Sequence, residues 1–395
     1  MTDRNATADL PETTRDSVFE MEHELFRDLA KRFVAKEIEP FALDWQKAPD
    51  GYPRELWRKA GEAGLIGLGI PSEHGGSDAD TLFNVVLNEE LGRSVAGCTL
   101  GGAVFSADLL TRLLVAFGSE PQKSTYFPGI LSGEIIQCAG ISEPNAGSDV
   151  KALASRARPV GNDYLLTGQK TFISNGMHAN LCYFVARTDN DVASGRDAMS
   201  VFIVDLAAKG CERRKLEAIG GRGGSIAEIF LADVRVPRSS MLGEEGTGLN
   251  VILAHLFMAD RMMLGLRALA VAELALDLTV DYTKNRRVFG KRVFDFQNTQ
   301  FKLAELKADI IAGQAMREMA LRRFVKNDLD PLTSSAMKLW MTQLEFRVAN
   351  ECLQLYGGYG YMNETPISRI FTYSRGETLY AGTSEIQKGI IARYL

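Results

Sequence analysis

The sequence predicts an α+β chain of three parts: a helical domain, a middle β domain and a second helical domain. Three observations predict this order. Apolar residues recur at helical spacing from residue 19 to about 134, short β-branched and aromatic runs fill residues 135 to 240, and helical spacing returns from Gly248. We therefore expect domains at 1–134, 135–242 and 243–395.

The first part begins with an amphipathic helix. Leu25, Phe26, Leu29 and Phe33 fall on one helical face. This helix should end before Pro40, because proline removes a backbone N–H and clashes with the preceding turn. A second helix is expected over 54–63, and further helices between 79 and 114 with joints at glycines. These joints are Gly97 and Gly101-Gly102.

The middle part contains five short runs of β-branched and aromatic residues separated by turn residues. Regular spacing of this kind predicts antiparallel strands in a small barrel or sandwich. The runs are residues 164–166, 171–173, 181–185, 200–204 and 228–231.

The last part carries a stripe of small and apolar residues at intervals of three and four. Such spacing predicts a helix face, and the small residues would permit close packing of helices. We interpret the stripe as the core of a helical bundle. Its members are Phe301, Ala304, Ala308, Ile311, Ala315 and Met319.

Composition limits the functional classes. The 395 residues are 46% apolar and 24% charged, with a net charge of −5, which argues against nucleic acid or an anionic membrane as the main partner. Five scattered cysteines without metal or redox spacing fit a reducing compartment. The first 17 residues lack a signal-peptide pattern, and the longest apolar run, 251–259, is too short to span a bilayer. We expect a cytoplasmic protein.

The most informative local segment is residues 141–149, Ile-Ser-Glu-Pro-Asn-Ala-Gly-Ser-Asp. Proline fixes φ, Asn and Gly tolerate positive φ, and the segment's backbone N–H groups could converge on an anionic or heteroaromatic ligand. An ordinary surface turn uses the same residue types. Taken alone, the segment leaves both interpretations open.

Five further motifs follow in order, and no dinucleotide-binding GxGxxG or Walker A pattern stands in the required context. Together with residues 141–149, they resemble the acyl-CoA dehydrogenase family over nearly the whole chain. The motifs are Gly-Gln-Lys-Thr-Phe-Ile-Ser-Asn-Gly at 168–176, Asn-Arg-Arg-Val-Phe-Gly-Lys at 285–291, Phe-Gln at 296–297, Gln-Leu-Tyr-Gly-Gly-Tyr-Gly at 354–360, and Tyr-Ala-Gly-Thr-Ser-Glu-Ile-Gln at 380–387.

The resemblance implies the acyl-CoA dehydrogenase fold, in which the last domain is a four-helix bundle. It also implies that FAD is held between the β domain and this bundle. Residues 139–148 would line the flavin ring and pyrophosphate, and 172–174 would flank the ring from the other side. Residues near 286–297 and 354–358 would reach the FAD of a neighbouring subunit, which implies a homo-oligomer, expected to be a tetramer. The implied cofactor-binding residues are Ala139, Ile141, Ser142, Gly147, Ser148, Phe172, Ile173, Ser174, Arg286, Val288, Phe296, Gln297, Gln354, Leu355, Gly357, Gly358, Thr383 and Glu385.

Two of these positions have plainer interpretations. Phe172 stands where the family often has Trp, and it could instead be a strand residue of the β-domain core. Arg286 suits a phosphate because its planar guanidinium forms paired hydrogen bonds, but it could also be an exposed helix residue.

The catalytic base departs from the family's commonest pattern. That pattern has Glu where this chain has Ala381, which cannot take a proton. A second branch, resembling the long-chain and isovaleryl enzymes, places a carboxylate just before an Arg, which here is Asp260-Arg261. Asp260 is therefore the candidate base, with a solvated or Arg-paired helix residue as the alternative; Glu143 and Glu385 are weaker candidates. The implied substrate-binding residues are Ser148, Phe257, Met258, Arg261, Ala381 and Gly382.

The implied activity is that of an FAD-dependent acyl-CoA dehydrogenase of fatty acid β-oxidation, which passes electrons to an electron-transfer flavoprotein. A carrier-bound acyl thioester could replace acyl-CoA. Two alternatives stay open: an oxidase or monooxygenase of the same fold, and a weakly catalytic subunit of a mixed oligomer. The four histidines show no metal spacing, so no metal is expected.

Overall fold

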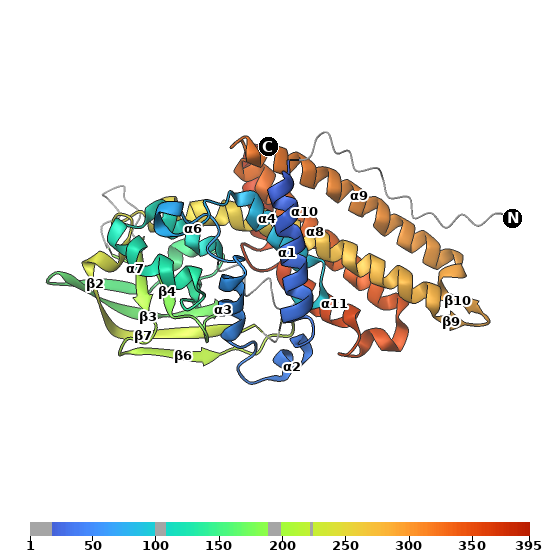
Figure 1. The fold of residues 1–395 in the computed structure, drawn as a ribbon, viewed down its shortest axis with the longest axis horizontal. Helices are drawn as coiled ribbons and strands as arrows, with labels where there is room; N and C mark the ends of the chain where they lie inside the picture. The colour runs from blue at the N-terminus through green and yellow to red at the C-terminus, as the bar shows by residue number, and fades with distance from the viewer. Residues whose placement is uncertain (1–17, 99–107, 189–198, 222–223) are drawn as a thin grey trace.

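A computed structural model of the chain describes residues 18–98, 108–188, 199–221 and 224–395. A sheet lies at one end, long helices form a bundle at the other, and shorter N-terminal helices lie across the junction (Figure 1). The predicted order of helical, β and helical parts is confirmed. The domain boundaries after residues 134 and 242 stay predictions.

The N-terminal part is helical, as predicted. The first helix buries Phe26, Ala30 and Phe33, and a π-helical turn carries it to Ile38, two residues before Pro40. The predicted joint at Gly101-Gly102 lies outside the described residues. The helices are α1 Met21–Phe33, the π-helix Val34–Ile38, α2 Ala42–Lys47, α3 Glu55–Glu62, the 3-10 turn Ser72–His74, α4 Thr81–Gly92, α6 Asp108–Phe117 and α7 Glu120–Leu131.

The middle part is an eight-stranded sheet in the order β6-β7-β3-β2-β4-β5-β8, with β1 beside β4. Most neighbours are antiparallel, as predicted, but β1 and β2 both pair with β4 in parallel, so the sheet is mixed. The strands are β1 Gln137–Gly140, β2 Arg156–Val160, β3 Asp163–Ile173, β4 Leu181–Arg187, β5 Met199–Asp205, β6 Cys211–Lys215, β7 Ala227–Pro237 and β8 Met241–Leu242.

Two details of the predicted strand set are wrong. The runs 164–166 and 171–173 are one strand, β3, whose register against β7 shifts twice, between Leu166 and Gly168 and between Lys170 and Ile173. Strands β2 and β6 were not predicted. β2 has two arginines and a proline, and β6 has four charged residues, so neither contains the run of β-branched and aromatic residues by which the other strands were predicted.

The C-terminal part is a helical bundle, with α10 packed against α8, α9, α11 and α12. A β9–β10 hairpin projects from its far end (Figure 1). The elements are the π-helix Gly248–Leu253, α8 Ala254–Asn285, β9 Arg287–Val288, β10 Lys291–Arg292, the 3-10 turn Val293–Asp295, α9 Gln297–Val325, α10 Pro331–Leu355, the 3-10 turn Gly357–Tyr361, α11 Pro366–Glu377, α12 Ser384–Ile391 and the 3-10 turn Ala392–Tyr394.

The predicted core stripe of α9 faces solvent in the single chain, so that interpretation is wrong. Phe301 is 59% exposed, Ile311 45% and Met319 46%. The helix instead buries Leu303, Leu306, Ile310, Gly313, Ala320 and Leu321. Both faces of α9 carry apolar residues at helical spacing, and only packing against α8 and α10 decides which face is the core of the chain.

Within the described part of the chain, no helix combines the length and apolar character needed to cross a bilayer. All five cysteines are free thiols, and four of them are buried. Cys211 is only partly buried.

Candidate active site

The turn-rich segment after β1 is fixed by a buried ion pair. Lys170 of β3 donates from Nζ to Glu143 Oε1 at 2.7 Å and to the Ile141 carbonyl at 3.1 Å. Glu143 also accepts hydrogen bonds from Ala154 N at 2.6 Å, Ser155 N at 2.9 Å and Ser155 Oγ at 2.6 Å. Burial by itself would raise the pKa of Glu143, but these hydrogen bonds outweigh burial and lower it. Glu143 therefore orders its own loop.

The loop and the end of β3 lie side by side. The Ser142 carbonyl accepts a hydrogen bond from Thr171 N at 2.8 Å. Ala139, Ile141 and Ser142 are partly buried, whereas Gly147 and Ser148 are exposed. The structure thus brings two of the predicted cofactor segments, 139–148 and 172–174, together.

Phe172 is held in an unusual conformation at the register shift of β3. Its φ is +60° and its side chain is 72% exposed. Positive φ is uncommon for a bulky residue and concentrates at ligand sites. The alternative of a core strand residue is therefore wrong for Phe172. It applies to Ile173, which is 3% exposed, while Ser174 is exposed.

Asp260, the candidate base, lies near the start of α8 and is partly buried. Among the described residues, no side chain or backbone group donates a hydrogen bond to its carboxylate. Burial raises the pKa of Asp260, Arg267 opposes this rise, and Glu377 adds to it. The pKa of this carboxyl is thereby moved toward the range in which a general base works.

The neighbours of Asp260 on α8 include one unsatisfied cation. Phe257, Met258 and Arg261 are partly buried, and the Arg261 guanidinium lies 5.9 Å from the centre of the Phe257 ring. Its Nε is buried without a hydrogen-bond partner. A buried donor of this kind is available to a polar group of a ligand.

The turn at Ala381 and Gly382 is the place where the commonest family pattern puts its base. Both residues have positive φ, +54° and +84°. Gln387 Nε2 donates to the carbonyls of Ala381 at 3.1 Å and Gly382 at 2.9 Å. Thr383 caps α12 by accepting a hydrogen bond from Ile386 N at 3.4 Å, and Glu385 is exposed on the first turn of that helix.

Lys338 of α10 connects this turn to Asp260. Its side chain is fully buried, and Nζ donates to the Gly382 carbonyl at 2.9 Å. Burial lowers the pKa of Lys338 to about 8, against the opposing charges of Glu377 and Asp260. Asp260 and the turn at Ala381, the two positions at which the resemblance would place a base, therefore both lie near the Lys338 ammonium group.

A second buried charge cluster lies behind Asp260. Arg267 of α8 donates to Glu377 Oε1 of α11 at 3.1 Å and to Asn88 Oδ1 of α4 at 3.2 Å. The charged residues Arg267, Lys338, Glu345 and Glu377 were missed by the sequence analysis. A signal was present in α10, where Lys338 and Glu345 are seven residues apart on the face that also carries Met341.

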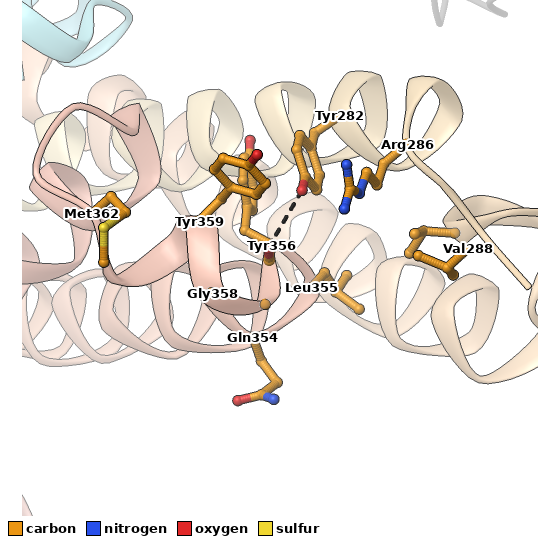
Figure 2. A pocket seen from close by; sticks show the side chains of 11 residues that line it. Tyr282, Arg286, Val288, Gln354, Leu355, Tyr356, Gly358, Tyr359 and Met362 are labelled. Atoms are coloured by element: carbon orange, nitrogen blue, oxygen red, sulfur yellow. Dashed lines mark hydrogen bonds between the residues drawn. The ribbon is translucent and has the colours of Figure 1, made fainter.

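A separate pocket of about 610 Å³ opens at the far end of α8 (Figure 2). Arg286 lies there with its guanidinium 5.5 Å from the centre of the Tyr359 ring, and the rings of Tyr282 and Tyr356 stack at 3.9 Å. Six predicted residues belong to the pocket lining, whereas Phe296 and Gln297 do not. The six are Arg286, Val288, Gln354, Leu355, Gly357 and Gly358.

The two groups of predicted cofactor residues are far apart in one chain. Asp260 and Arg286 stand near opposite ends of α8, about 39 Å apart at the helical rise of about 1.5 Å per residue. One flavin dinucleotide cannot span that distance. The stacked rings and exposed guanidinium of the far pocket nevertheless suit the nucleotide half of such a cofactor.

Comparison with known proteins finds matches to all three parts of the chain. Three family models match: the acyl-CoA dehydrogenase N-terminal domain at residues 20–134, the middle domain at 138–234 and the C-terminal domain at 246–395. A long-chain specific mitochondrial acyl-CoA dehydrogenase of Rattus norvegicus is 35% identical, over 96% of this chain and 87% of the relative.

Two further relatives bear on function. An acryloyl-CoA reductase (NADH) of Anaerotignum propionicum is 34% identical, over 94% of each chain. The solved structure of an acyl-CoA dehydrogenase from Geobacillus kaustophilus is 36% identical and superimposes with a TM-score of 0.92, covering 96% of this chain and 99% of that one.

Proposed function

The chain belongs to the acyl-CoA dehydrogenase family, the oxidoreductases that act on CH–CH groups, and we propose that it oxidises an acyl-CoA to the trans-2-enoyl thioester with Asp260 as base. The observation that carries this proposal is the Asp260 carboxylate, which accepts no hydrogen bond from any described residue and lies with the Ala381–Gly382 turn around Lys338.

Asp260 removes the α-proton of the thioester. Its carboxylate is free to accept a proton because no protein donor occupies it, and its raised pKa matches that task. Ala381 carries no competing acid. Compared with Glu, Asp is shorter by about one C–C bond of ~1.5 Å. A misplacement of about 1 Å can cost on the order of 100-fold in rate, so the acyl group must approach α8 closely.

The substrate would lie between α8 and the Ala381–Gly382 turn. Phe257 and Met258 supply apolar contacts, the Arg261 Nε supplies a free donor, and Ser148 lies exposed on the loop after β1. Ala381 and Gly382 present little side chain, which leaves room for the reacting carbons. A backbone N–H aimed at the thioester oxygen would stabilise the negative charge that develops there.

FAD is the oxidant in this proposal and takes the β-hydrogen as a hydride when bound. The loop 139–148, the exposed Phe172 and Ser174, and the start of α12 at Thr383 and Glu385 would hold its flavin side. The pocket at Arg286 would hold the nucleotide of an FAD bound mainly by a second subunit. An electron-transfer flavoprotein would accept the electrons in this proposal.

The same geometry supports a homo-oligomer, and we propose a tetramer. The far pocket is too distant from Asp260 to serve the same FAD within one chain. The exposed apolar stripe of α9, with Phe301, Ile311 and Met319, and the 43% exposed Trp340 of α10 offer a surface that a second copy would cover. We propose that this assembly works in the cytoplasm in fatty acid β-oxidation.

Anaerobic reduction of the bound flavin by a panel of acyl-CoAs tests the function. The wild type should be bleached, and Asp260→Ala should lose at least about 100-fold in rate because no other group takes the α-proton. Asp260→Glu restores the reach usual in this branch and should keep or raise the rate. Asp277→Ala changes an exposed carboxylate farther along α8 and should have no effect. Equal rates in wild type and Asp260→Ala would reject Asp260 as the base.

The reverse reaction, saturation of an enoyl thioester, uses the same groups, and the acryloyl-CoA reductase relative makes it the second candidate. Incubation with acrylyl-CoA and NADH would show NADH oxidation if the chain works in that direction. Rapid reoxidation of the reduced flavin by air would instead favour an oxidase. Binding of FAD without reduction by any acyl thioester would favour a weakly catalytic subunit of a mixed oligomer.

A further inference from the structure

Two buried side chains hold the carbonyl groups of the Ala381–Gly382 turn. Lys338 of α10 donates from Nζ to the Gly382 carbonyl at 2.9 Å. Gln387 of α12 donates from Nε2 to the same carbonyl at 2.9 Å and to the Ala381 carbonyl at 3.1 Å. Both side chains are 0% exposed. One backbone oxygen therefore receives two buried donors, and one of them is a cation.

These hydrogen bonds also fix where the N–H groups of the turn point. Among the described residues no peptide bond is cis, so each N–H points away from the carbonyl of its own peptide plane. The Ala381 carbonyl shares a plane with the Gly382 N–H, and the Gly382 carbonyl shares one with the Thr383 N–H. Neither N–H donates to any group of the described residues. Two free donors therefore point away from Lys338 and Gln387.

The turn has a conformation that needs support. Ala381 has a φ of +54°, which is uncommon for a residue with a Cβ. Gly382 has a φ of +84°, and a Cβ added there would lie 2.7 Å from Gln387 Nε2. Gln387 Oε1 is buried without a hydrogen-bond partner among the described residues, which is costly for a group that serves packing alone. Strained backbone that is held in this way is typical of ligand sites.

We propose that Lys338 and Gln387 are positioning residues that hold the Gly382 and Thr383 N–H groups toward the acyl thioester, where they stabilise the negative charge that develops on its carbonyl oxygen. The inference rests on the proposed function, in which the substrate lies between α8 and this turn. The ammonium on the Gly382 carbonyl polarises that peptide, so the Thr383 N–H becomes a stronger donor. Donors that are fixed before the reaction stabilise such a charge without reorganisation.

The rate and the affinity of anaerobic flavin reduction separate positioning from simple packing. Lys338→Met and Gln387→Leu each leave only one side-chain donor on the Gly382 carbonyl. The limiting rate with acyl-CoA should fall about 10–100-fold in each variant, because the N–H groups are no longer held in place. The Kd for acyl-CoA should change less than about 3-fold, because the lost interaction acts on the transition state.

Lys388→Met is the matched control, since it removes an exposed ammonium beside Gln387 on α12 and should leave the rate unchanged. A wild-type limiting rate in either Lys338→Met or Gln387→Leu overturns the proposal. A loss confined to the affinity for acyl-CoA overturns it as well. Flavin content shows which variants fold, and if Lys338→Met holds no FAD, Gln387→Leu alone decides. Loss of FAD from both variants would make the two side chains structural ties and overturn the proposal.

Infrared spectroscopy of a bound product tests the N–H groups without turnover. The probe is trans-2-enoyl-CoA with ¹³C at the thioester carbonyl, bound to the oxidised FAD enzyme. Its carbonyl stretch should lie lower than in solution on the wild type and return toward the solution value in Lys338→Met and Gln387→Leu. A tie that only joins α10 to α12 would change stability but not this stretch.

The two measurements distinguish failure of this inference from failure of the proposed reaction. Equal stretches in the wild type and the variants overturn the positioning role even if acyl-CoA reduces the flavin. A stretch that responds to the variants in an enzyme that no acyl-CoA reduces supports the positioning role and rejects the proposed oxidation. Failure of the wild type to bind the enoyl-CoA overturns both.

Discussion

The sheet and the bundle each contain a buried ion pair, and the two pairs are built differently. In the sheet, Glu143 receives four hydrogen bonds, one of them from Lys170. In the bundle, Glu377 is paired with Arg267 through one oxygen only, and the nearby Glu345 receives none. A buried charge whose hydrogen bonds are complete fixes a loop, whereas one with free oxygens retains a capacity to hold or exchange a proton.

The largest loss of stability is expected when the Glu143–Lys170 ion pair of the sheet is broken. Glu143→Leu leaves Lys170 buried without its carboxylate and frees the N–H groups of Ala154 and Ser155. Breaking a buried pair by removing one partner costs about 3–5 kcal/mol. Urea unfolding of the FAD-bound enzyme should show a loss of that size. A loss below about 1 kcal/mol would show that the pair does not hold the loop.

A smaller effect is expected in the pH dependence of stability at Lys338. The pKa of Lys338 is about 8 in the folded protein, against a usual value of 10.5, so the folded state binds fewer protons between these values. Stability from this group therefore rises with pH from about 8 to 10.5, because the penalty for burying the charged amine is relieved.

Lys338→Met lacks this titration. The difference in unfolding free energy, wild type minus Lys338→Met, should increase between pH 7 and pH 10, because the two proteins share all other titratable groups. A constant difference across this range would show that Lys338 has an ordinary pKa in the folded protein.

The smallest change in unfolding free energy is expected for the matched substitution in the bundle, Glu345→Leu. It removes a buried polar group that no described donor satisfies, and replacing such a group by an apolar one is close to neutral. Unfolding in urea should change by less than about 1 kcal/mol. A loss as large as that of Glu143→Leu would show that the two buried carboxyl groups stabilise the sheet and the bundle equally, against the contrast between these regions.

The sequence by itself determined the order of helical, β and helical parts, because helical and strand periodicity are local properties of the chain. It also located the turn-rich loop at 141–149 and excluded Ala381 as a base. Asp260 followed from the resemblance, and its role stays a prediction. Local patterns did not find β2 and β6, because neither strand contains a run of β-branched and aromatic residues.

Only the tertiary structure decided which apolar face of α9 is buried, since both faces carry helical spacing and packing against α8 and α10 selects one. It also decided the partners of the buried charges. Arg267 and Glu377 are 110 residues apart, and Lys338 meets the Gly382 carbonyl across 44 residues. A charge at a core-facing position signals an unusual environment in the sequence, but the strength and sign of its interactions depend on groups that only folding brings near it.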